Sequence, residues 1–258
     1  MFIVSIDVDA GSRKLGLINK GKNDANVHKY FSEYRVGEVE ESTVPMLVET
    51  FDRVEIPVTF AVRGQLTEVN GSVLEMLLDS TVKHDIGAHG YYHTEFTGLS
   101  SVEAEKELAM ISTGLKKYGI VPRSFVFPRN KVAHLDLLAR HGYKCYRGYG
   151  NFLKDCMYIE KTGKLYNIHP SLYLEKGARL TYLKGILDAC VAKKLPFHAW
   201  FHPWSFGETK ECVQKIINKV FIPFFSYAQV KRKSNLLDFE TMYSAALKVE
   251  NMKNDTAS

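Results

Sequence analysis

Short apolar runs alternate with segments of helical pattern along the whole chain, and this alternation restricts the possible folds more than any other feature. The runs are rich in β-branched and aromatic residues and are shorter than typical buried helices, which favours buried strands. The first run begins at Phe2 and ends with Asp7 and Asp9. Further strands are predicted at residues 57–62, 85–89, 124–128, 143–147, 165–169, 197–202 and 224–230.

Amphipathic segments separate these runs. Helices are predicted at residues 42–53, 65–79, 100–118, 131–141, 181–194, 208–220 and 239–248. Such an alternation is typical of a parallel sheet wrapped by helices. Polar residues of reactive types follow several strands, and the C-terminal ends of barrel strands meet at one mouth. We therefore expect a barrel of seven or eight strands rather than a doubly wound sheet.

A single domain is expected, because the 258 residues contain no repeat and no break in composition. We predict that this domain spans residues 1–250. The polar residues 12–42 follow the first carboxylates directly and are predicted to form a loop over the site. Residues 251–258 are expected to be a frayed polar tail.

Asp7 and Asp9 are the first candidates for chemistry. In an extended strand their side chains point to the same side, roughly 7 Å apart. Two like charges beside an apolar strand cost free energy unless a metal ion or another cation neutralises them. The alternative is a turn at the strand end, in which both aspartates face water.

Further candidates follow the later strands. His89 and His93 lie four residues apart after the third run, and two histidines with one aspartate leave open positions on a divalent ion, as catalytic sites require. Histidines at this spacing are also common on helix surfaces. His202 ends the seventh run and suits a general acid, or else a buried core histidine. Arg129 follows the fourth run, where a surface salt bridge is the alternative role.

These segments resemble the NodB-like polysaccharide deacetylases, also called carbohydrate esterase family four, from Phe2 to about Phe239. The resemblance implies a single distorted (β/α) barrel of about seven parallel strands. It also implies a hydrolase that removes N-acetyl groups with one divalent metal ion. By this resemblance, Asp7 is the catalytic base, Asp9, His89 and His93 are the metal ligands, and His202 is the catalytic acid.

The third motif of the family departs here, since Val126 and Asn130 stand where the family has arginine and glycine. Arg129 is therefore expected to supply the cation that orients Asp7. A backbone N–H near Arg129 or Asn130 is expected to stabilise the oxyanion. The family also tunes its catalytic histidine with a carboxylate, and for His202 this role stays open among Glu160, Asp155 and Asp188.

Substrate contacts are expected from Tyr92, Asn130 and Trp204, because aromatic rings can stack on a sugar. Zinc is the expected metal, with cobalt, nickel and manganese as alternatives, since a mixed carboxylate and imidazole set suits several ions. The ion would bind a water molecule and lower its pKa, and Asp7 would accept the proton of that water.

The predicted function is hydrolysis of a linear amide: removal of an N-acetyl or N-acyl group from an amino sugar, such as a surface-polysaccharide precursor or a sugar nucleotide. One alternative is an allantoinase-type or cyclic-imide amidohydrolase of the same fold, and another is a non-catalytic carbohydrate-binding barrel. The net charge of +5 is mild and dispersed, so no nucleic-acid partner is expected. No export signal opens the chain and no apolar run reaches the roughly 20 residues of a membrane span, which predicts a cytoplasmic protein.

Overall fold

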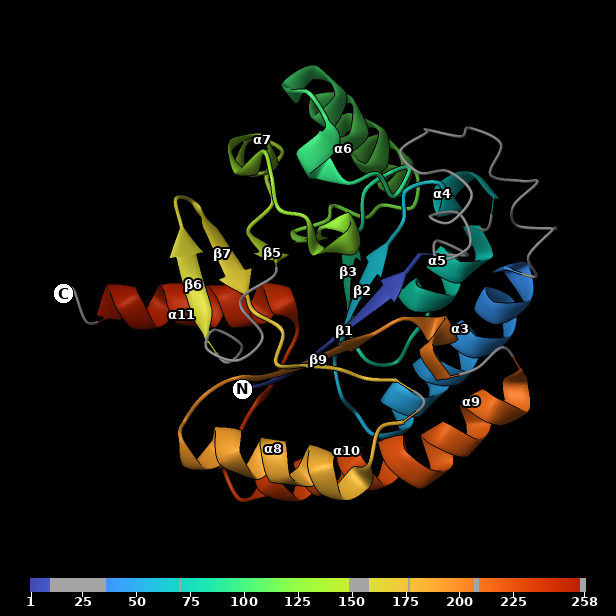
Figure 1. Cartoon of the computed structure of the whole chain (residues 1–258), viewed down its shortest axis with the longest axis vertical. Coiled ribbons are helices and arrows are strands. Elements are labelled where there is room, and N and C mark those ends of the chain that lie inside the picture. Colours follow the sequence, from blue (N-terminus) through green and yellow to red (C-terminus); the bar gives the residue numbers. More distant parts are fainter. Residues whose placement is uncertain (10–35, 70, 149–157, 176, 207–208, 256–258) are drawn as a thin grey trace.

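The computed structural model describes residues 1–9, 36–69, 71–148, 158–175, 177–206 and 209–255 (Figure 1). Its strands are β1 (Phe2–Val8), β2 (Thr59–Val62), β3 (Asp85–Ala88), β4 (Ser124–Val126), β5 (Cys145–Arg147), β6 (Ile159–Thr162), β7 (Leu165–Ile168), β8 (Leu172–Tyr173), β9 (Phe197–Phe201) and β10 (Phe239–Glu240). Its helices are α3 (Val36–Arg53), α4 (Leu66–Val69), α5 (Gly71–Leu78), α6 (Ser101–Lys116), α7 (Leu135–Arg140), α8 (Leu180–Ala192), α9 (Lys210–Ile216), α10 (Ile222–Lys233) and α11 (Met242–Asp255).

The strands form one curled sheet in the order β6-β7-β5-β4-β3-β2-β1-β9-β8, with β10 beside β1. The recorded pairs are parallel except for the β6–β7 hairpin. The seven predicted strands before residue 203 all correspond to a strand of this sheet. The expected distorted (β/α) barrel of about seven parallel strands is thereby confirmed.

Strand β1 shows why the barrel has two different faces. Phe2, Val4, Ile6 and Val8 belong to the large apolar core that the sheet shares with the surrounding helices. The alternate residue Ile3 belongs to a separate apolar cluster inside the barrel. Because side chains alternate along a strand, the inner face of β1 continues from Ile3 through Ser5 to Asp7.

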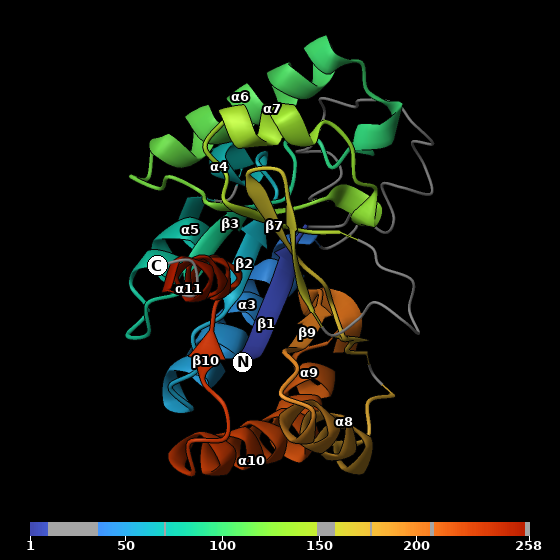
Figure 2. The same cartoon turned by 90° about the vertical axis from the view of Figure 1, so that its left-hand side faces the viewer.

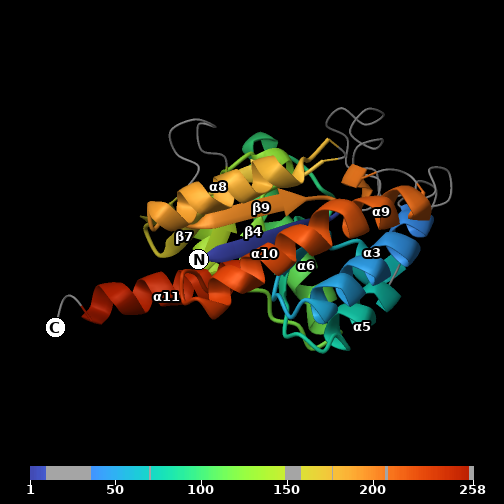
Figure 3. The same cartoon turned by 90° about the horizontal axis from the view of Figure 1, so that it is seen from below.

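Helices cover the outside of the sheet in these views. In Figure 1, α6 and α7 lie at the top, α3, α5 and α9 at the right, and α8 and α10 at the bottom. Figure 3 shows α8 and α10 on either side of the line of β9 and β1. Helix α6 begins with a capping box, in which Ser100 and Glu103 satisfy each other's backbone N–H groups, and this fixes where the helix starts.

Helix α11 packs against the inner cluster from the end of the barrel where the strands begin. Met242, Ala245 and Ala246 pack with Ile3 in the inner apolar cluster, and the backbone N–H of Met242 donates to Thr59 Oγ1 at 2.8 Å. Figure 2 shows α11 end-on beside the strands. This helix therefore fills the barrel interior beneath the polar residues of β1.

Three predictions at the ends of the chain differ from the structure. Residues 224–230 are not a strand, because they lie within α10. Residues 239–248 are not one helix: β10 comes first and α11 then runs to Asp255, past the predicted domain end at residue 250, so most of the predicted frayed tail is helical. The predicted loop at 12–42 lies largely outside the described residues, and its last part already belongs to α3.

Among the described residues, no helix combines the length and the apolar character that crossing a bilayer requires.

Candidate active site

Three strand ends bring five titratable side chains to one point. Asp7 and Asp9 lie at the end of β1, His89 and His93 follow β3, and His202 follows β9. His93 Nε2 lies 3.5 Å from Asp9 Oδ2, and His89 Nε2 lies 4.0 Å from Asp7 Oδ2. His202 Nε2 lies 3.8 Å from Asp7 Oδ2 and 3.6 Å from Asp9 Oδ2. The five side chains that were expected to converge therefore do so.

Asp9, His89 and His93 make a donor set that fits a divalent ion, since one ligand atom of each lies within 4.8 Å of the others. His89 Nδ1 lies 2.8 Å from the carbonyl oxygen of Val126. A carbonyl only accepts, so Nδ1 carries the proton and Nε2 keeps its lone pair. That Nε2 is buried without a hydrogen-bond partner among the described residues. Burial lowers the pKa of both histidines, which keeps them in the neutral form that binds metals.

The segment 89–93 is held in place by Glu107 of α6. Glu107 Oε2 accepts hydrogen bonds from the backbone N–H groups of Tyr91, at 2.7 Å, and Tyr92, at 3.1 Å. Within the segment, Gly90 has a φ of +67°, a conformation that side chains disfavour. A buried carboxylate and a glycine thus fix the backbone conformation that brings His93 close to His89.

The cation that orients Asp7 is Arg147, at the end of β5, and the prediction of Arg129 is wrong. Arg147 NH1 donates to Asp7 Oδ1 at 2.7 Å and NH2 donates to Oδ2 at 2.5 Å. The exposed fractions of Arg147 and Asp7 are 0% and 2%. Arg129 instead adopts a φ of +54° in the turn after β4, where its NH1 lies 3.3 Å from Glu95 Oε1 at the surface.

Sequence reasoning missed Arg147 although a signal was present. The predicted strand at 143–147 ends in a charged residue. The C-terminal ends of parallel strands lie at the same edge of a sheet, so this residue lies at the same edge as the other strand ends. Nothing in the sequence says that β5 places this residue opposite Asp7, across β4, β3 and β2.

The Arg147 charge decides the protonation state of Asp7. Burial alone would raise the pKa of Asp7, but the charge and the hydrogen bonds of Arg147 outweigh it and hold the pKa below its usual value. Asp7 is therefore an ionised carboxylate inside the barrel, able to accept a proton.

Arg147 is itself fixed from several sides. Its NH1 donates to Ser5 Oγ at 2.9 Å, its Nε donates to Asn130 Oδ1 at 3.4 Å, and its guanidinium lies 4.2 Å from the centre of the Trp200 ring. Ser5 Oγ also lies 2.8 Å from His198 Nε2. These contacts form a polar layer between the inner apolar cluster and the mouth, which leaves Arg147 a single orientation.

His202 is enclosed by aromatic rings. The Trp204 ring stacks on it with centroids 4.1 Å apart and planes at 19°, and its Nδ1 lies 3.4 Å from the Tyr173 hydroxyl. Burial lowers the pKa of His202 to about 4, although Asp7 acts in the opposite direction. In the form without an ion, the imidazole is therefore neutral at neutral pH.

Two of the three carboxylates that could tune His202 are paired with other residues. Glu160 Oε2 lies 3.3 Å from His169 Nε2, and Asp188 Oδ1 lies 2.6 Å from Lys231 Nζ. Asp155 lies outside the described residues. The Tyr173 hydroxyl is the described group that faces Nδ1.

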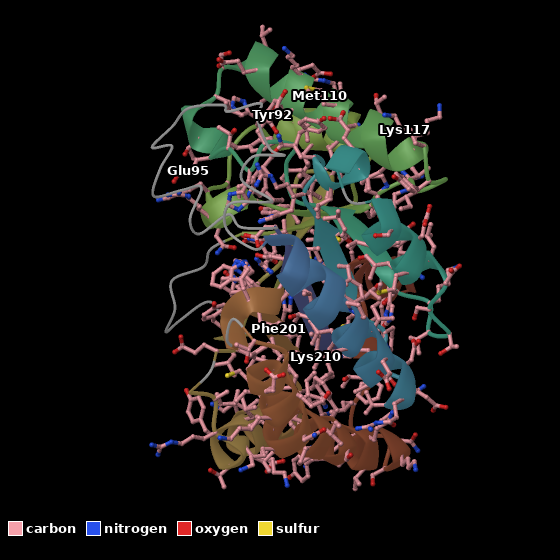
Figure 4. The ribbon with its side chains drawn as sticks, turned by 90° about the vertical axis from the view of Figure 1, so that its right-hand side faces the viewer. Tyr92, Glu95, Met110, Lys117, Phe201 and Lys210 are labelled. Carbon is pink, nitrogen blue, oxygen red and sulfur yellow. The ribbon has the colours of Figure 1, made fainter. Side chains whose placement is uncertain are left out.

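Of the predicted substrate residues, Asn130 and Trp204 contact residues of the site, and Tyr92 directly precedes His93 in the chain. Tyr92 and Glu95 appear in the upper part of Figure 4, near α6 and above Phe201 of β9. Asn130 contacts Arg147, and Trp204 Nε1 donates to Asp9 Oδ1 at 3.0 Å. Contact of Tyr92, Asn130 and Trp204 with a substrate stays a prediction.

Comparison with known proteins finds a family model that matches part of the chain. Residues 32–146 match the family model described as polysaccharide deacetylase. This range contains His89 and His93, whereas the aspartates of β1 and His202 lie outside it. Together with the fold and the motifs, the match confirms the predicted relationship to the NodB-like polysaccharide deacetylases.

Individual proteins are also similar to this chain in sequence or in fold. A peptidoglycan deacetylase from Helicobacter pylori is 25% identical over 143 residues, which cover 54% of this chain and 46% of that protein, so the match spans under half of the relative's length. The crystal structure of a probable polysaccharide deacetylase from Pseudomonas aeruginosa has a TM-score of 0.71 at 13% identity, over 95% of this chain and 89% of that one. The Puue allantoinase has a TM-score of 0.69 at 14% identity, over 95% and 88%. At these identities the two structures show the shared fold.

Proposed function

We propose that this chain is a metal-dependent hydrolase that removes an N-acetyl or other N-acyl group from an amino sugar. One observation carries the proposal: the converging donor atoms of Asp9, His89 and His93 lie beside a buried carboxylate, Asp7, that Arg147 keeps ionised. A site that only bound sugar would need neither an unpartnered buried imidazole nitrogen nor an ionised carboxylate inside the barrel.

The roles of the side chains follow from their positions. A divalent ion held by Asp9, His89 and His93 would polarise the amide carbonyl and supply a nucleophilic water near neutral pH. Asp7 accepts the proton of the attacking water, because Arg147 favours its ionised form but leaves it beside the mouth. His202 Nε2 lies 3.8 Å from Asp7 Oδ2, so a small closing movement lets the proton pass to the imidazole. His202 then delivers this proton to the leaving amine nitrogen, without which the C–N bond does not break.

The substrate is proposed to be a carbohydrate or a small N-acyl compound. The half-buried aromatic side chains of Tyr173 and Trp204, which lie beside His202, support a ring-shaped ligand, because aromatic faces pack well on sugar rings. A sugar nucleotide or a surface-polysaccharide precursor, a zinc ion and a cytoplasmic location stay predictions.

Metal analysis of two aspartate variants tests the proposal. Purified wild-type protein is expected to bind one divalent ion and to release acetate from an N-acetylated sugar. Asp9→Asn should lose the ion, whereas Asp7→Asn should keep the ion and lose turnover. Equal loss of metal in both variants would contradict the division of roles, and a wild-type chain that binds no ion would remove the proposal.

The two alternatives are separated in the same screen. Allantoin or a cyclic imide as the only substrate turned over would favour a ring-opening amidohydrolase, which the fold shared with an allantoinase permits. Binding of sugars without any product would favour a carbohydrate-binding barrel.

A further inference from the structure

Trp204 contacts two members of the site at once. Its Nε1 donates a hydrogen bond to Asp9 Oδ1 at 3.0 Å, and one face of its ring stacks on His202 with centroids 4.1 Å apart. The residue lies in the short turn Pro203–Phe206 directly after β9. The ring face that lies on His202 is covered by the protein itself, so sugar stacking on that face does not explain the residue.

The two oxygens of Asp9 consequently have different surroundings. Oδ1 accepts the indole N–H, whereas Oδ2 lies 3.5 Å from His93 Nε2 and 3.6 Å from His202 Nε2. An indole nitrogen can only donate, so it selects the ionised carboxylate and holds the plane of that carboxylate in one orientation.

We propose that Trp204 is a positioning residue that makes Asp9 bind the metal ion through Oδ2 and sets the distance between this carboxylate and His202. The inference rests on the proposed function, since it concerns the same ion. Its N–H fixes the ligand oxygen, and its stacked ring holds the imidazole against rotation. One side chain thus couples the geometry of the metal ligand to that of the acid.

A role limited to filling space makes a different prediction. If the ring only packs, any flat aromatic side chain at position 204 should preserve metal affinity. If the N–H matters, its removal should weaken binding even when the ring remains. Hydrogen-bond partners of metal ligands typically contribute 10–100-fold in metal affinity, which is a loss that titration can resolve.

The test is calorimetric titration of metal-free protein with Zn²⁺. Trp204→Phe is expected to weaken Zn²⁺ binding by about 10–100-fold, and 3-benzothienylalanine at position 204, which keeps the bicyclic ring but lacks the N–H, is expected to weaken it similarly. Thermal unfolding without the ion checks that each variant folds. If Trp204→Phe does not fold, the benzothienyl variant decides.

Trp200→Phe is the matched control. Trp200 also neighbours His202, with ring centroids 5.5 Å apart, but its replacement leaves the hydrogen bond from Trp204 in place, so Zn²⁺ affinity should stay at the wild-type value.

The titrations distinguish a failure of the positioning role of Trp204 from a failure of the proposed metal site. Wild-type Zn²⁺ affinity in both position-204 variants overturns the positioning role. Failure of the wild-type chain to bind Zn²⁺, or unchanged binding after Asp9→Asn alone, overturns the proposed metal site itself.

Discussion

Replacing Arg147 with methionine tests the electrostatics at the centre of the barrel. Methionine approximates the length of the side chain but removes its charge and both hydrogen bonds to Asp7. The Asp7 carboxylate, with an exposed fraction of 2%, is then left buried without its cation. We expect a less stable protein whose Asp7 takes up a proton more readily and cannot fill the proposed role of base.

The size of the expected loss of stability follows from this burial. Removing one partner of a buried ion pair typically costs about 3–5 kcal/mol, because the other charge stays buried. For a chain of this length, about 2 °C of Tm corresponds to each kcal/mol, so Arg147→Met should lower Tm by about 6–10 °C. The folded-state pKa of Asp7 is lowered in the wild type, so the stability that this group contributes is present above its unfolded pKa and is lost as the pH falls. The deficit of the variant should therefore be larger at pH 8 than at pH 4.

The assay is thermal unfolding of metal-free protein at both pH values, so that the ion contributes nothing. Arg129→Met is the matched control, because its pair with Glu95 is about half exposed and such surface pairs contribute about 0–1 kcal/mol. The double variant Asp7→Asn with Arg147→Met removes both charges and should recover part of the loss. Equal small effects at positions 147 and 129, or simple additivity in the double variant, would refute the reasoning.

Two further predictions concern the surroundings of the site, and a third concerns His84, which directly precedes β3 at the opposite end of the sheet. Glu107→Gln removes the charge of the acceptor for the backbone of segment 89–93, and should weaken Zn²⁺ binding in titration; unchanged affinity would mean that this segment holds its shape without the carboxylate. Ser5→Ala breaks the link between His198 and Arg147, so we expect lower kcat with unchanged Zn²⁺ affinity, and a loss of affinity would contradict it. Burial lowers the pKa of His84 to about 4; because its folded-state pKa lies below its unfolded value, stability should fall as the pH drops from about 6.5 toward 4, by up to about 3 kcal/mol. His84→Asn, which keeps an acceptor for the N–H of Val58, should flatten that dependence in thermal unfolding, and parallel curves would argue against it.

The strand pattern was readable from sequence because burial on both faces demands apolar runs, and β1 is an example. The run at 224–230 also fits a helical period: Phe224, Phe225 and Ala228 are buried in α10, as is Phe221 at the end of the preceding π-helical turn Ile217–Phe221. A short apolar run cannot be assigned to a strand or to a helix from local composition when its residues fit both the strand period and the helical period.

The convergence of Asp9, His89 and His93 could be predicted because each follows a strand and belongs to a short local motif. Arg147 could not, since its role depends on which strands are neighbours and on how far the sheet curls. Arg129 occupied the expected place in sequence, but a left-handed turn takes its side chain to Glu95 at the surface. Local motifs thus identified the candidate ligands, while long-range pairing decided which cation reaches Asp7.

Both tryptophans of the chain, Trp200 and Trp204, lie beside His202. Tryptophan fluorescence, when it is excited selectively, therefore comes from this one region of the molecule. A shift in the emission maximum or a change in intensity would report the binding of an ion or a sugar without an attached dye. It would be insensitive to changes in distant helices. The protein thus carries its own optical reporter at the point where its chemistry is proposed to occur.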